Sequence, residues 1–142
     1  MMVDITNKDI VYREATAYGK IKLKKETIAA IKKGEIKKGD VFTITRIATI
    51  LAVKNTSTSI PLCHNIPINH VNLDFKIGED YIEVFVNVKA NAKTGVEMEA
   101  LHGVAIALLN IWDMVKYLEK DEKGAYPYIK IEEIKVIEKI KK

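Results

Sequence analysis

Strict alternation of apolar and polar residues is clearest in the middle of the chain. Two such runs lie close together, at residues 71–77 and 82–88, with Val, Leu, Phe or Ile at every second position. The segment "GED" at 78–80 separates them. Because side chains of a strand point alternately to its two faces, the pattern predicts a hairpin that buries one face.

Weaker alternation marks two further strands. Residues 12–23 carry Ala and Ile at partly alternating positions, and a last strand is expected from about Tyr128. The apolar phase of that last strand changes near Glu132 and Glu133. A change of phase inside a strand predicts a bulge at that point.

Helical spacing of apolar residues appears twice between the first strand and the hairpin. Residues 23–31 place apolar side chains three and four positions apart, and Gly34 is expected to end this helix. Asp40 is a good N-cap for a second helix, "VFTITRIATILAVKN". That helix is rich in β-branched residues, so we expect burial to stabilise it rather than intrinsic propensity.

A long third helix is expected to run to about Glu119. Thr94 and Glu97 have the spacing of a capping box and predict its start. The helix is apolar on nearly all sides, and a single sheet can cover only one of them. We therefore expect its other side to contact a second subunit.

The order strand, two helices, hairpin, helix, strand predicts an α+β fold, a ferredoxin-like antiparallel sheet packed against helices, with an additional helix. No repeat or linker divides the chain, so residues 1–142 are expected to form a single domain.

Composition narrows the class of protein. Apolar residues make up 48% of the chain, charged residues 30%, and the net charge is +4. This charge suits an anionic small molecule but is too low to indicate nucleic acid binding. One cysteine and no evident signal peptide or membrane span predict a cytoplasmic protein. Heavy use of Lys, Glu and Ile is typical of heat-adapted proteins.

The segment "SIPLCHNIPINH" raises the question of a catalytic or metal site. Cys63 and His64 are adjacent, and in extended backbone their side chains would point in opposite directions, which disfavours a nucleophile–base pair. One Cys and three scattered His lack the spacing of a zinc site. We interpret Cys63 as a small, mostly apolar residue, whereas His64 is equally compatible with a pocket donor and with a structural role.

Charged residues in apolar surroundings are the other candidates. "KKGDVF" places Lys38 at a helix start, where an anion would be favoured, although a solvated basic turn is the commoner case. In the long helix Glu97 is explained by the capping box, whereas Glu99 is not. Asp113 and Lys116 share a helix face and form either a salt bridge or an acid–base pair with proton affinities shifted by burial.

Taken together, the motifs "KGDVF", "RIA", "IPLCH", "KTGVEMEAL" and "WDMVK", with "MVDI" and "VYREA" near the start, resemble one family over nearly the whole chain. It is the molybdenum cofactor biosynthesis protein C family, the cyclic pyranopterin monophosphate synthases. The resemblance implies a ferredoxin-like fold and a hexamer, a trimer of dimers with sites at subunit interfaces. It also implies conversion of 3′,8-cyclo-7,8-dihydro-GTP to cyclic pyranopterin monophosphate with release of diphosphate, a phosphorus–oxygen lyase reaction.

The resemblance also assigns roles to residues. It implies that Lys38, Asp113 and Lys116 are catalytic. The residues that it implies for substrate binding are Leu62, Cys63, His64, Met98, Glu99, Arg13, Lys54 and Glu97. No metal site or redox cofactor is implied, and Mg²⁺ with the triphosphate is left open. The chain departs from the family at Asn65, where proline is common, and lacks the glycine-rich tail of some bacterial members.

Two other functions remain to be weighed against the synthase. A ferredoxin-like RNA-binding module could stack bases on Tyr81 and Phe85, which share a strand face. Glu83 lies between them, however, and the Gly/aromatic pattern of such modules is absent. A non-catalytic oligomer that binds a nucleotide would need basic residues only, and the acids of the long helix argue against it.

Overall fold

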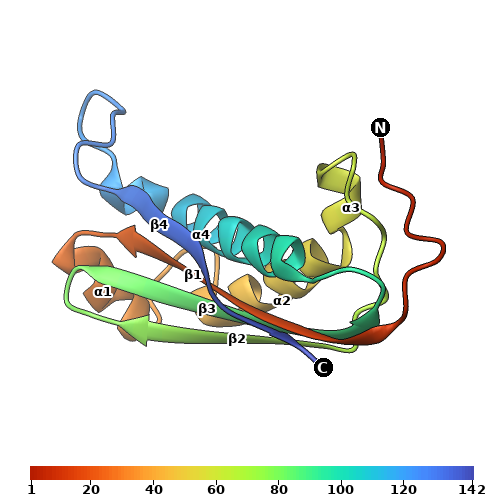
Figure 1. Cartoon of the computed structure of the whole chain (residues 1–142). Coiled ribbons are helices and arrows are strands. Elements are labelled where there is room, and N and C mark those ends of the chain that lie inside the picture. The colour runs from red at the N-terminus through yellow and green to blue at the C-terminus, as the bar shows by residue number, and fades with distance from the viewer.

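A four-stranded antiparallel sheet forms one layer of the molecule (Figure 1). The computed structural model describes all of residues 1–142. The strands are β1 (Val11–Lys22), β2 (His70–Ile77), β3 (Tyr81–Ala92) and β4 (Lys130–Lys141), in the order β2-β3-β1-β4. The predicted hairpin is confirmed, because β2 and β3 pair from His70 to Ile77 through the turn at 78–80.

Four helices complete the fold: α1 (Lys25–Lys32), α2 (Val41–Lys54), α3 (Thr56–Ser59) and α4 (Glu97–Glu119). α4 packs on β1 and β3, and α2 packs on α4 and β2. The α+β, ferredoxin-like arrangement is therefore confirmed, with two further helices, α1 and the single-turn α3, in the first crossover. The core beneath α2 and α4 is one connected cluster of 26 buried residues.

Glycines at two positions allow α4 to approach its neighbours closely. A Cβ at Gly19 of β1 would lie 2.6 Å from a methyl carbon of Val104 and 2.7 Å from one of Leu108. A Cβ at Gly103 of α4 would lie 2.9 Å from a methyl carbon of Val53 in α2. All three distances are shorter than ordinary van der Waals contact, so glycine at each position allows the close packing of α4.

Several predicted element boundaries are confirmed. Asp40 caps α2, because its carboxylate accepts a hydrogen bond of 3.2 Å from the backbone N–H of Thr43. Gly34, at φ 70°, follows the end of α1. The bulge in β4 lies where the phase changes, with Glu133 at φ 61°, although the strand begins at Lys130 rather than near Tyr128.

The predicted capping box at the start of α4 is wrong. The helix begins at Glu97, its N-cap residue is Val96, and no side chain caps it. Val96 is only 1% exposed, and its carbonyl accepts the hydrogen bond of Ala100 N–H. Burial of Val96 therefore fixes the first turn, and Thr94 lies outside the helix. The Glu97 carboxylate is left without a capping role.

The side of α4 that faces away from the sheet is partly covered by α2, and its contact with a second subunit stays a prediction. Large apolar side chains nevertheless remain exposed on both helices and on β4: Ile44, Ile47, Ile50, Leu51, Leu109, Ile134, Val136 and Ile137. By length and hydropathy α4 would be able to cross a membrane, but half of its apolar window is buried within the fold, as in a core helix.

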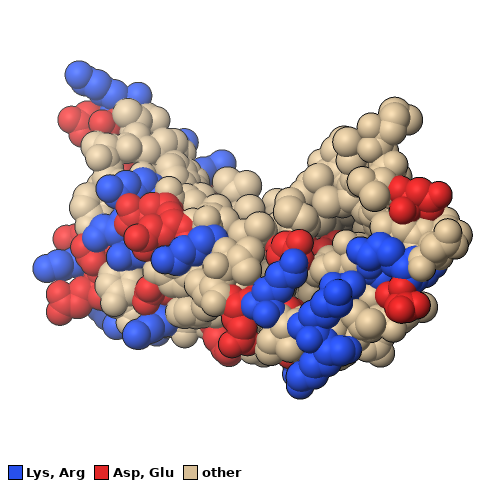
Figure 2. Space-filling view, in the orientation of Figure 1, with Lys and Arg blue, Asp and Glu red and all other residues tan.

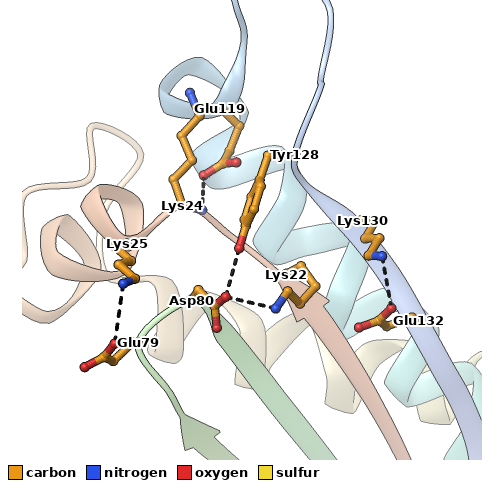
Figure 3. A network of polar contacts seen from close by, with 9 residues as sticks. All are labelled: Lys22, Lys24, Lys25, Glu79, Asp80, Glu119, Tyr128, Lys130 and Glu132. Carbon is orange, nitrogen blue, oxygen red and sulfur yellow. Dashed lines mark hydrogen bonds and ion pairs between the residues drawn. The ribbon is translucent and has the colours of Figure 1, made fainter.

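A polar network fixes the C-terminal end of α4 against the junction of β1 and α1 (Figure 3). Glu119 is fully buried, and its Oε2 accepts a hydrogen bond of 3.0 Å from Lys24 N–H and another from the Thr27 hydroxyl. Beside it, Asp80 accepts hydrogen bonds of 2.9 Å from the Lys22 ammonium and the Tyr128 hydroxyl. Glu119 thus joins the end of α4 to Lys24 and Thr27, whereas Asp80 joins the β2–β3 turn to β1 and to the segment before β4.

Candidate active site

Lys38, Asp113 and Lys116 form one cluster on the surface of the chain. Lys38 Nζ lies 2.7 Å from Asp113 Oδ2, and Lys116 Nζ lies 3.1 Å from Asp113 Oδ1. Lys38 Nζ also donates a hydrogen bond of 3.3 Å to the Asp113 carbonyl. The turn before α2 thus brings Lys38 to the two residues that α4 supplies, and the three predicted catalytic residues lie together.

One interpretation of the sequence is that burial shifts the proton affinities of this cluster, but hydrogen bonds rather than burial dominate the shift of the Asp113 pKa. The Asp113 side chain is 53% exposed. Hydrogen bonds from Lys38 and then from Lys116 hold the pKa of Asp113 below its ordinary value, and burial has only a minor opposing effect. Asp113 is therefore a stable carboxylate at neutral pH. With two ammonium groups around it, the cluster keeps one excess positive charge and suits an anionic ligand.

A second cluster of predicted residues lines a cavity of about 320 Å³ at the N-terminal end of α4. Six of the eight predicted binding residues line it: Leu62, Cys63, His64, Glu97, Met98 and Glu99. The loop before β2 supplies the first three, and the first turn of α4 supplies the others. The cavity combines apolar side chains with two carboxylates and a histidine, which is the character of a small-molecule site.

The two carboxylates of the cavity lack full hydrogen-bond partners within the chain. Glu99 is 3% exposed, and its Oε1 has no partner; the same is true of the buried Oε2 of Glu97. Burial raises the pKa of Glu99, and the nearby Glu97 adds to this rise. Buried polar atoms are normally hydrogen-bonded. These atoms therefore indicate that a ligand or a second chain completes the site.

Cys63 and His64 both line the cavity, and the extended backbone assumed for this pair is not present. The reason is that residues 61–63 form a turn rather than a strand, and the Cys63 N–H donates to the Ile60 carbonyl. His64 Nε2 donates a hydrogen bond of 2.6 Å to the Val3 carbonyl. No hydrogen bond joins Cys63 to His64, and Nδ1 is the ring nitrogen of His64 that this hydrogen bond leaves available.

Cys63 should react slowly with alkylating reagents. Burial, and then the carboxylates of Glu99 and Glu97, raise the pKa of the Cys63 thiol, so less thiolate exists at neutral pH than for a free thiol. We expect iodoacetamide to modify Cys63 at least several-fold more slowly than glutathione, with the rise in rate displaced to higher pH. Mass spectrometry of the labelled chain measures this rate. Alkylation faster than that of glutathione would identify an activated nucleophile instead.

Arg13 and Lys54, the other two predicted binding residues, do not line this cavity. Arg13 is 7% exposed on the helix-facing side of β1; its Nη2 donates a long hydrogen bond of 3.4 Å to the Lys93 carbonyl, and its Nε has no partner. Lys54 is exposed at the last position of α2. Arg13 is thus a buried cation with a free donor, whereas Lys54 is a solvent-facing charge.

The N-terminal segment also contributes to the cavity, through Val3, Ile5 and Lys8. The Lys93 ammonium holds this segment by a hydrogen bond of 3.0 Å to the Thr6 carbonyl. The resemblance of "MVDI" to the family was the only signal for this part of the chain, and nothing in the sequence singles out Lys8. Lysine and acidic side chains are intermixed on the face shown in Figure 2, so this face has no extended basic surface.

The two clusters lie far apart on α4. Glu99 and Asp113 are fourteen residues apart on this helix, which corresponds to about 21 Å at 1.5 Å per residue. Both side chains therefore cannot reach one reacting centre within a single chain. The chain carries two separate clusters, one acidic and apolar, the other basic.

Comparison with known proteins identifies a family and several relatives of the chain. The model of the MoaC family matches residues 2–141. A protein of Pyrococcus horikoshii, named as a probable cyclic pyranopterin monophosphate synthase, is 61% identical over 99% of this chain and 88% of its own length. Proteins of the same name from Pyrococcus furiosus and Pyrococcus abyssi are 61% and 58% identical over 99% of this chain, covering 90% and 88% of their own lengths.

Proposed function

The chain belongs to the MoaC family, and from this we propose that it is a cyclic pyranopterin monophosphate synthase of molybdenum cofactor biosynthesis. Its substrate is 3′,8-cyclo-7,8-dihydro-GTP, and its products are cyclic pyranopterin monophosphate and diphosphate. The observation that supports this function best is the contact of Lys38 and Lys116 with Asp113, in a chain similar over its whole length to proteins of that name. We place the reaction in the cytoplasm.

Release of diphosphate is the step that needs positive charge. A ribose oxygen attacks the first phosphorus, a new P–O bond forms, and the bond to the diphosphate leaving group breaks. Negative charge grows on the leaving oxygens, and fixed cations stabilise it. Lys38 and Lys116 supply these cations in our proposal. Arg13, with its free Nε, and the exposed Lys54 are the candidates for the remaining phosphate oxygens.

Rearrangement of the ring system is the step that needs proton transfer. C–N bonds open and close, so protons must be delivered to nitrogen and removed from it. Asp113 is ionised, because its pKa lies below the ordinary value, and it can accept a proton. The Lys116 ammonium, 3.1 Å from that carboxylate, can donate one. The overall conversion changes no net oxidation state, so the proposal requires no redox cofactor or iron–sulfur cluster.

The cavity at the start of α4 is assigned to recognition of the base-derived part of the substrate. Glu99 and Glu97 offer unpartnered carboxylate oxygens to ring N–H and amino groups, and His64 offers its other ring nitrogen, Nδ1. Leu62 and Met98 cover apolar ring surface. Cys63 shapes the wall of the cavity.

Alanine substitutions should separate the two residues of the "LCH" segment. Cys63→Ala is expected to keep much of the activity, because the thiol has a raised pKa and no base within hydrogen-bond distance. His64→Ala is expected to lose about tenfold or more, since it removes a hydrogen-bonding ring from the cavity wall and the bond that holds Val3 there. Steady-state turnover of the two variants measures the difference. A folded but inactive Cys63→Ala variant would refute this assignment.

We propose that each active site combines the acidic half-site of one chain with the basic half-site of another. Fourteen residues are close to four helical turns, so Glu99 and Asp113 point roughly the same way from α4. Two such helices packed antiparallel about a two-fold axis would bring Glu99 of one chain towards Asp113 of the other. The free carboxylate oxygens of Glu99 and Glu97 and the exposed apolar side chains of α2 and α4 support this model. The proposed assembly is a hexamer, a trimer of dimers.

The function is tested by supplying the product of the upstream radical enzyme to the purified protein. Oxidation of the reaction mixture should then give the fluorescent pterin derived from cyclic pyranopterin monophosphate, whereas GTP should give none. Parallel reactions with EDTA and with Mg²⁺ measure any need for that ion. A nucleotide- or RNA-binding module without catalytic activity would bind the substrate and return it unchanged.

A further inference from the structure

Tyr117 joins the end of α4 to the turn that carries Lys38. Its hydroxyl oxygen accepts a hydrogen bond of 3.0 Å from the backbone N–H of Lys37. The Lys37 ammonium lies 5.1 Å from the centre of the Tyr117 ring. Tyr117 thus contacts both the backbone and the side chain of the residue directly before Lys38, and Lys38 in turn contacts Asp113.

Few other contacts fix the two central residues of this turn, Lys37 and Lys38. Ile36 is buried at its start, and the Gly39 N–H donates to the Ile36 carbonyl at 3.1 Å, which makes Lys37 and Lys38 the two central residues. Gly39 has φ 116°, a conformation that favours glycine. Both lysines are exposed. The contacts to Tyr117 and Asp113 are therefore what orients the central residues of the turn relative to α4.

Tyr117 is well placed to hold this turn because its own position is fixed. It lies four residues after Asp113 on α4, and its ring packs against the hydrophobic core. Two residues further on, the buried Glu119 binds Lys24 and Thr27 and anchors the end of the helix. A rigid element that supports a catalytic side chain holds it more accurately than a free loop does.

We propose that Tyr117 is a positioning residue: it holds the Lys37–Lys38 turn so that the Lys38 ammonium meets Asp113. The role of Lys38 in turnover rests on the proposed function, whereas the contact itself does not. Tyr117 acts through the turn and makes no contact with substrate in this proposal. Loss of its hydroxyl should free the turn and lower the fraction of time that Lys38 spends at Asp113.

The test compares Tyr117→Phe with the unmodified chain in two measurements. The first is the rate at which Lys38 is acetylated, read by competitive isotope labelling and mass spectrometry. We expect this rate to rise about 3- to 10-fold, the range that one net hydrogen bond covers. The second is turnover: kcat should fall by a similar factor while KM changes less than about twofold, because the turn is needed in the transition state.

Tyr128→Phe is the matched control. It also removes one tyrosine hydroxyl hydrogen bond, the 2.9 Å bond to Asp80, but this bond lies outside the cluster. The control should keep the acetylation rate of Lys38 and both kinetic constants. Equal changes in the two variants would show a general loss of rigidity and overturn the proposal.

The outcomes separate the positioning role from the proposed function. Unchanged acetylation of Lys38 in Tyr117→Phe overturns the positioning role, whatever happens to turnover. Faster acetylation with a lower kcat supports both. Faster acetylation in a protein whose unmodified form has no synthase activity supports the positioning contact and overturns the proposed function.

Discussion

Replacing Lys116 by alanine is expected to slow turnover by about 100-fold or more, the usual range for loss of a general acid or base. Lys116 Nζ lies 3.1 Å from Asp113 and its side chain is 42% exposed. Because so exposed a side chain contributes little to the core, the variant should fold normally. Steady-state turnover and thermal unfolding of the same preparation measure the two effects.

Lys116→Arg tests whether Lys116 transfers a proton or only supplies charge. The guanidinium stays protonated in proteins, so arginine should not restore activity if the proton must move. Lys120→Ala, which removes an exposed lysine just after α4, is the control and should retain full activity. Near-normal turnover of the arginine variant would show that Lys116 only supplies positive charge to the phosphates and transfers no proton.

Mixing two inactive variants, Glu99→Ala and Asp113→Ala, is expected to restore activity. If each site takes Glu99 from one chain and Asp113 from the other, a mixed dimer contains one intact site and one doubly damaged site. Random exchange of equal amounts makes half of the dimers mixed, so about one quarter of all sites should be intact. Turnover after subunit exchange, with exchange followed by mass spectrometry, measures this fraction.

The control for this experiment mixes Lys38→Ala with Asp113→Ala. Lys38 and Asp113 lie 2.7 Å apart in one chain, so they belong to the same half-site. Every site of a mixed dimer then lacks one of the two residues, and no activity should return. If exchange is complete and the Glu99 and Asp113 pair also stays inactive, the shared-site model is wrong for this pair.

Much of the fold follows from local patterns in the sequence. Alternation over residues 71–77 and 82–88 predicted the hairpin correctly, because β2 packs against α2 and β3 packs against α4. Asp40 was recognised as a cap because its carboxylate needs only the next turn of backbone. The bulge near Glu133 followed from the change of apolar phase in β4.

The sequence failed where tertiary contacts override a local rule. Burial of Val96 starts α4 at Glu97, so the capping box suggested by Thr94 does not form. A turn rather than a strand brings Cys63 and His64 to the same cavity.

The sequence also did not predict the exposure of Asp113 or the contact that holds the turn carrying Lys38. Asp113 is an exposed carboxylate rather than a buried one, because it lies on the outer side of α4. The contact of Tyr117 with Lys37 joins residues eighty positions apart, and no sequence pattern marks it.

The most direct test of the proposed function is to follow diphosphate and the pterin product together in one reaction with the cyclised dihydro-GTP. The proposal predicts that the purified protein releases both in equal amounts, and that Lys116→Ala releases about 100-fold less of each. Diphosphate without the pterin would indicate a simple hydrolase. Tight binding of the substrate with neither product would contradict the synthase altogether.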